Sequence, residues 1–150
     1  MRRLMFAAIV VVFASLLVVL PARAADRGPC DEERWLRITP QEWTSELVKG
    51  LIRCAANRFD VDVSTAMRVA DCESSFYAFA HSNGNYGVFQ QRGVYWPDRA
   101  KALLREDWFN KAQWDRIEDV PQGPYIARAN VLLSMKMVRN TGWGDWSCYR

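Results

Sequence analysis

The four cysteines constrain the fold of this 150-residue chain more than any other feature, because they decide whether covalent bonds or a metal hold it together. Outside the reducing cytosol, an even number of cysteines in a small domain usually forms disulfides. Cys30, Cys54, Cys72 and Cys148 allow three pairings, and the residues alone leave all three open. Zinc is the rival interpretation, but no two cysteines have ligand spacing and the single histidine, His81, stands apart from them. We therefore expect two disulfides and no metal.

The first 24 residues predict export from the cytosol. Arg2 and Arg3 precede an uncharged apolar run, residues 4–20, which is followed by Pro21 and the small-residue triplet Ala22-Arg23-Ala24. This is the pattern of a signal peptide, and we expect cleavage after Ala24. An uncleaved anchor is the alternative, since a run of 17 residues is at the short limit for crossing a bilayer. The expected mature protein is secreted, with no stable membrane anchor.

The charge balance argues against nucleic acid as a partner. Of 20 basic residues, three lie in the first 24, so the rest of the chain carries 17 basic against 17 acidic side chains. A domain without net charge offers no broad cationic surface to the phosphates of a nucleic acid. Half of the residues are hydrophobic, which is typical of a globular domain. We expect a monomer that needs no cofactor.

The mature chain divides into a polar leader, residues 25–38, and one domain, residues 39–150. Thr39-Pro40-Gln41-Glu42 has the residues of a helix start, and the apolar spacing after it predicts a helix over residues 40–58. Asp62 or Ser64 can cap a second helix that runs to about Ser74 and places Glu73 in its last turn. Asp71 should then face solvent.

Turn-forming residues dominate the next segment, residues 75–92, and predict a small β-hairpin. Three further helices are expected: one from about Pro97, a short one around Trp114, and a last one from Pro124 to Val138, ended by Asn140-Thr141-Gly142. With at most one minor sheet, the predicted fold class is mainly α (α+β).

Glu73 is the candidate catalytic residue. The C-terminal end of a helix is negative, so a carboxylate in the last turn is disfavoured as an anion. The apolar neighbours Val69, Ala70, Phe76 and Tyr77 can also remove water from it. Both effects raise the pKa of the carboxyl and keep it protonated, which is the state that a general acid requires.

The segment after Glu73 has the composition of a sugar-binding surface. It contains no acidic residue between Ser74 and Pro97, and instead interleaves hydroxyl and amide side chains with aromatic rings. Neutral hydrogen-bonding groups suit sugar hydroxyl and acetamido groups, while rings stack on the apolar faces of sugars. We therefore expect a glycan as the substrate.

Three motifs resemble the lysozyme-like muralytic domains of secreted actinobacterial proteins, which include transglycosylase-like domains and resuscitation-promoting factors. Glu-Ser followed by Gly-x-x-Gln is also similar to soluble lytic transglycosylases and goose-type lysozymes. The resemblance covers residues 61–148. Its motifs are Cys72-Glu73-Ser74, the run from Asn83 through Gly87 to Gln90, and Gly142-Trp143-Gly144-Asp145-Trp146-Ser147-Cys148.

The resemblance implies a lysozyme-like helical domain that cleaves the β-1,4 bond between N-acetylmuramic acid and N-acetylglucosamine in peptidoglycan. Glu73 is then the catalytic acid. The other candidates that contact substrate are Ser74, Tyr86, Gly87, Gln90 and Tyr95. The resemblance also implies a Cys72–Cys148 disulfide and, with it, a Cys30–Cys54 disulfide.

One element of lytic transglycosylases is missing. Many of them carry Ala-Tyr-Asn near the final helices, and the nearest sequence here, Arg128-Ala129-Asn130, lacks the tyrosine. Which aromatic residue, if any, takes that role is therefore open among Tyr86, Tyr95 and Tyr125.

With no second acidic residue in the loop after Glu73, the sequence favours a single-carboxyl, lytic transglycosylase mechanism. Hydrolysis, as in a muramidase, is the alternative, with Asp98 or a later acidic residue folding back to assist. A wall-binding or signalling module without activity and a structural or inhibitory disulfide protein without glycan affinity are further alternatives.

Overall fold

The computed structural model describes Cys30 and residues 33–149. The predicted signal peptide lies outside this part of the chain, as does the beginning of the predicted leader. The fold is mainly helical, with one small antiparallel sheet and two disulfides, as the sequence predicts. None of the helices in the described part is long and apolar enough to cross a membrane.

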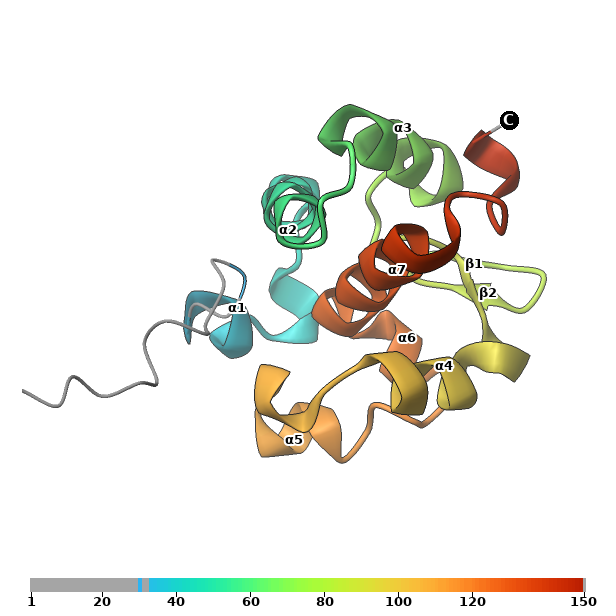
Figure 1. Cartoon of the computed structure of the whole chain (residues 1–150). Helices are drawn as coiled ribbons and strands as arrows, with labels where there is room; N and C mark the ends of the chain where they lie inside the picture. The colour runs from blue at the N-terminus through green and yellow to red at the C-terminus, as the bar shows by residue number, and fades with distance from the viewer. Residues whose placement is uncertain (1–29, 31–32, 150) are drawn as a thin grey trace, which may run out of the picture.

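Helix α7, Ala127–Thr141, forms the centre of the molecule (Figure 1). It contacts α2, Ser45–Arg58, on one side, and α4, Trp96–Leu103, and α6, Gln122–Tyr125, on the other. Residues 127–135 of α7 are buried without interruption, so the helix has no solvent-facing side along this stretch. The sequence predicts an apolar stripe here, but the packing on both sides buries the polar residues between the apolar ones as well.

The helix predicted over residues 40–58 begins later than expected. A short 3-10 helix spans Pro40–Glu42, and its Glu42 carboxylate accepts hydrogen bonds from the Thr39 backbone N–H and hydroxyl, both at 2.7 Å. The chain is then extended at Trp43 and Thr44. Helix α2 starts at Ser45 because the Thr44 hydroxyl accepts a hydrogen bond from the Leu47 N–H at 3.3 Å and caps a new first turn.

Part of the predicted leader packs into the domain. Helix α1, Glu33–Arg37, carries Trp35, which is only 3% exposed and belongs to the hydrophobic core. Its ring lies parallel to that of Trp43, with centroids 6.0 Å apart. Cys30 is joined to Cys54 of α2 by a disulfide. This segment is therefore covalently and sterically tied to α2.

Helix α3, Val63–Ser74, starts and ends as predicted. The Asp62 side chain accepts a hydrogen bond from the Thr65 N–H at 2.7 Å and caps the helix, while Ser75 leaves it with φ of 50°. Asp71 is exposed, as expected. Glu73 lies in the last turn.

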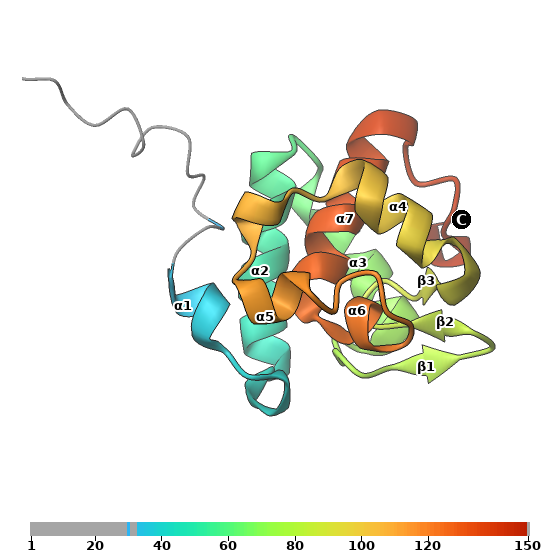
Figure 2. The same cartoon turned by 90° about the horizontal axis from the view of Figure 1, so that it is seen from below.

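The predicted hairpin is part of a three-stranded sheet. Strands β1, His81–Ser82, and β2, Asn85–Tyr86, are joined by Asn83 and Gly84, both with positive φ, as the Asn-Gly pair predicts. Strand β3, Gln91–Arg92, extends the sheet in the order β1-β2-β3, with Asn85 opposite Arg92 and Tyr86 opposite Gln91. The sheet lies beside α7, with β3 next to the start of α4 (Figure 2).

The last predicted helix is divided in two. Pro124 lies inside the short α6, and the chain is extended at Ile126 before α7 begins at Ala127. The prediction that Pro124 starts the long helix is therefore wrong. The carbonyl of Pro124 accepts a hydrogen bond from the Asn130 side chain at 3.0 Å, so a contact across the break replaces a continuous helical ladder. The other two predicted helices are present as α4 and as α5, Lys111–Trp114.

Candidate active site

Glu73 is partly buried at the C-terminal end of α3. Burial raises the pKa of its carboxyl above the ordinary value, and the hydrogen bond that it accepts from the Cys148 backbone N–H acts in the opposite, lowering direction. The Cys72–Cys148 disulfide, with Cα atoms 5.9 Å apart, holds the C-terminal segment (residues 142–149) beside this turn. The shift has the direction that the sequence predicts, and it favours the protonated acid.

Glu73 lines a pocket of about 290 Å³. The sheet and the residues between its strands contribute Asn85, Gln90, Gln91 and Arg92. Later parts of the chain contribute Tyr95, Arg99, Asp145, Trp146 and Ser147. Of the predicted site residues, the structure therefore brings Glu73, Gln90 and Tyr95 to one pocket.

The Gln90 side chain is held in place by the backbone of a nearby residue. Its φ of 45° is in the left-handed region, and its side-chain Nε2 donates to the Gly87 carbonyl at 2.9 Å. This contact engages one N–H of the amide, while the Oε1 atom has no hydrogen-bond partner among the described residues. A fixed amide that lines the pocket can accept a hydrogen bond from a sugar hydroxyl or acetamido N–H.

Ser74, Gly87 and Tyr86 lie outside the pocket lining. The Ser74 hydroxyl is 2.7 Å from the carbonyl oxygen of Val88 and ties the end of α3 to the following loop. Gly87 has φ of 76°, and a Cβ atom there would collide with the Pro124 carbonyl and the Asn130 amide. These two residues therefore hold the segment that carries Gln90.

Tyr86 belongs to a separate aromatic cluster. Its ring stacks on His81 at 4.6 Å between centroids and meets Tyr125 edge-on at 5.6 Å. Phe79 continues the cluster at 5.6 Å from Tyr125. Of the three tyrosines that the sequence leaves open as partners of the acid, Tyr95 is the one that lines the pocket.

Asn130 organises the segment before Gln90, and the sequence alone does not assign it this role. Its fully buried side chain accepts from the Phe89 N–H at 2.9 Å and donates to the carbonyls of Tyr86 and Pro124, each at 3.0 Å. One amide thus joins α7, α6 and the loop after β2. The one sequence signal for Asn130 is its position in the Arg128-Ala129-Asn130 segment.

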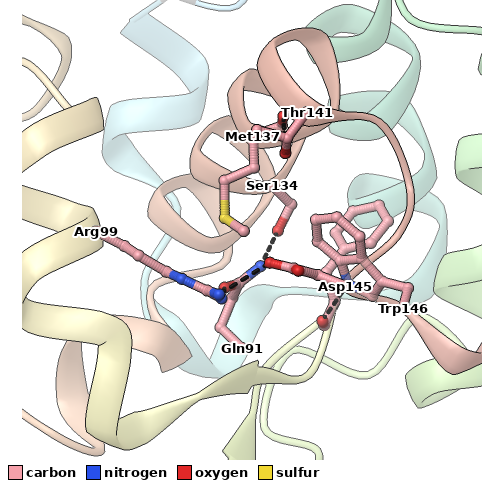
Figure 3. Close-up of polar contacts among 8 residues, drawn as sticks. Gln91, Arg99, Ser134, Met137, Thr141, Asp145 and Trp146 are labelled. Carbon is pink, nitrogen blue, oxygen red and sulfur yellow. Dashed lines mark hydrogen bonds and ion pairs between the residues drawn. The ribbon is translucent and has the colours of Figure 1, made fainter.

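A chain of polar contacts forms one wall of the pocket and joins Gln91, Arg99 and Asp145 of its lining to α7 (Figure 3). Ser134 of α7 accepts from Gln91 Nε2 at 2.8 Å, Gln91 Oε1 accepts from Arg99 Nη1 at 3.0 Å, and Arg99 Nη2 pairs with Asp145 Oδ2 at 2.9 Å. Next to Asp145, the Trp146 indole N–H donates to the Phe89 carbonyl at 2.9 Å. These contacts fix the C-terminal segment against the sheet and α4.

Asp145 is therefore the acidic residue that folds back to the site. Asp98, the other candidate for this role, is exposed and does not line the pocket. The Asp145 carboxylate is bound to the Arg99 guanidinium, so one of its oxygens is already occupied. In the part of the chain that the structure describes, no three His, Cys, Asp or Glu side chains are grouped to hold a metal ion.

The described site thus combines a half-buried carboxyl of raised pKa, neutral amides, an exposed tyrosine ring and an arginine–aspartate pair around one open pocket. Such a lining can donate a proton to a bound ligand and hydrogen-bond its polar groups. Comparisons with protein-family models, with curated proteins and with solved structures found no match to this chain.

Proposed function

We propose that this protein is a secreted, lysozyme-like enzyme that cleaves the β-1,4 bond between N-acetylmuramic acid and N-acetylglucosamine in peptidoglycan strands, with Glu73 as the catalytic acid. The observation that carries the proposal is the Glu73 carboxyl, whose pKa is raised by burial while it lines an open pocket. A general acid needs this combination of a retained proton and access to the leaving oxygen.

The rest of the pocket supports a sugar ligand. Asn85 and Gln90 supply neutral amides, and the Tyr95 ring, 53% exposed, offers a face on which a sugar can stack. Two disulfides and the absence of a membrane-spanning helix among the described residues are compatible with an extracytoplasmic protein. Export itself is part of the proposal and rests on the predicted signal peptide.

The proposed reaction is that of a lytic transglycosylase. Protonated Glu73 gives its proton to the glycosidic oxygen, and the bond from that oxygen to carbon one of the muramoyl sugar breaks. The acetamido group of the same sugar stabilises the positive charge at carbon one. The Glu73 carboxylate then takes the proton from the hydroxyl at carbon six, whose oxygen closes on carbon one. The product is a 1,6-anhydro sugar, and Glu73 is protonated again.

Hydrolysis is the second candidate, because Asp145 lines the same pocket and brings a second carboxylate to it. Two-carboxylate glycosidases use such a group as nucleophile or to activate water. The Arg99 ion pair holds the Asp145 carboxylate, which favours the single-carboxyl route.

Mass spectrometry of the products from purified cell walls tests the proposal. A product one water lighter than the hydrolytic fragment identifies the transglycosylase, and a product of full mass identifies the hydrolase. Glu73→Gln should lower the rate by about 10²-fold or more, because the proton donor is lost. Retained activity in this variant would remove Glu73 from the mechanism, and wall binding without any product would identify a binding module.

A further inference from the structure

Four acidic or basic side chains line the pocket: Glu73, Arg92, Arg99 and Asp145. Arg99 and Asp145 compensate each other through their 2.9 Å ion pair. Glu73 carries no charge in the protonated form that the proposed reaction requires. The working state of the pocket therefore keeps one uncompensated charge, the guanidinium of Arg92.

The Arg92 side chain has no ion pair or hydrogen bond with any other residue in the described part of the chain. It lies on β3 directly opposite Asn85 of β2, and both residues line the pocket. The side chain is exposed, so its guanidinium is available to a ligand. Arg99 differs, since its guanidinium already contacts Gln91, Asp145 and the Tyr95 ring.

A guanidinium presents N–H donors in a planar fork that matches the two oxygens of a carboxylate. The neighbouring Asn85 amide adds a neutral donor and acceptor beside that fork. This pair suits a sugar that bears an acidic substituent next to its hydroxyl and acetamido groups. A neutral amino-sugar polymer would leave the charge of Arg92 without a partner.

We propose that Arg92 is a specificity-determining residue, which binds a carboxylate of the glycan and so selects acid-bearing amino-sugar strands over neutral ones. The proposal rests on the proposed function for the identity of the ligand. It assigns to Arg92 the discrimination between two polymers that share the same backbone linkage.

Binding and cleavage test the two proposals separately. In the Glu73→Gln background, calorimetry measures binding of three probes: peptidoglycan fragments without stem peptides, whose lactyl carboxylates are free, the same fragments after amidation of those carboxylates, and N-acetylglucosamine oligomers of equal length. We expect the free-carboxylate fragments to bind about tenfold more tightly than the other two, and this advantage to shrink with added salt.

Adding Arg92→Gln should make the three probes bind alike, and Arg92→Lys should keep part of the preference, because it retains the charge without the fork. Arg53→Gln, an exposed arginine on α2 that does not line the pocket, is the matched control and should leave the preference intact. Three outcomes would overturn the proposal. The first is equal binding of the three probes while Arg92 is still present, the second is no binding of any probe, and the third is a preference that survives Arg92→Gln. If the preference follows Arg92 but the unmodified protein cuts none of the fragments, the proposed function fails and the role of Arg92 in binding stands.

Discussion

At the scale of single residues, the protonation of Glu73 links stability to pH. Because burial raises the pKa of Glu73 in the folded protein, the folded state holds this proton more tightly than the unfolded state. The resulting stabilisation is complete below the ordinary pKa of 4.5 and is lost as the pH rises through the raised value. Chemical unfolding at a series of pH values should show that Glu73→Gln gains stability relative to the unmodified protein across this interval. A difference between the two proteins that does not change with pH would contradict the raised pKa.

Asn130 supports the loop that carries Gln90 through three side-chain hydrogen bonds. Asn130→Ala would leave the Phe89 N–H and two carbonyls, those of Tyr86 and Pro124, without their partner. We expect a loss of about 3 kcal/mol in the free energy of unfolding, measured with urea. Asn57→Ala, an exposed position on α2, is the control and should cost less than about 1 kcal/mol. A similar loss in both variants would show that the three hydrogen bonds are not the cause.

At the scale of secondary-structure elements, Arg99 joins α4 to β3 and to the C-terminal segment. Asp145 is half exposed, so removing its charge should cost under about 1 kcal/mol. Arg99→Met also leaves the Oε1 atom of Gln91 unpaired in a side chain that is only 2% exposed. This variant should therefore cost about 1–3 kcal/mol more than Asp145→Asn in the free energy of unfolding. If Arg99→Met and Asp145→Asn lowered the free energy of unfolding equally, the stabilisation by Arg99 would come from its ion pair with Asp145 and not from its contact with Gln91.

At the scale of the whole molecule, the two disulfides close loops of different length and serve different regions. Cys72–Cys148 spans 76 residues and Cys30–Cys54 spans 24. The chain-entropy model gives upper values of about 4.5 and 3.5 kcal/mol for their contributions to stability. Replacing either pair with serine should lower the melting temperature, with the larger effect for Cys72 and Cys148.

The same variants separate stability from activity. Below the melting temperature of both, replacing Cys72 and Cys148 should lower the proposed wall cleavage, because this disulfide holds the backbone N–H of Cys148 at the Glu73 carboxyl. Replacing Cys30 and Cys54 should leave this cleavage unchanged, since their disulfide joins Cys30 to α2 and neither cysteine lines the pocket. Equal losses of cleavage in the two variants would contradict a local role for the Cys72–Cys148 disulfide.

Local chemistry made much of the fold predictable from the sequence. Asp62 as a helix cap, Asn83-Gly84 as a hairpin turn and Gly142 as a helix end each act on neighbours within a few residues, and each is present in the structure. The position of Glu73 in a last helical turn follows from the same short-range signals. Where two local signals compete, as at Thr39 and Thr44, the prediction began the long helix at the wrong one, because either threonine can cap a first turn.

Only the tertiary structure decided the long-range contacts that hold the walls of the pocket and the Gln90 loop. Arg99 and Asp145 are 46 residues apart, and Asn130 reaches back 41 residues to Phe89. Such contacts depend on how α3, α4 and the sheet pack around α7, and the spacing of residues along a helix or strand carries no information about them. For that reason the amino-acid sequence determined most of the elements and the place of Glu73 in its helix, while packing around α7 determined which side chains share the pocket with Glu73.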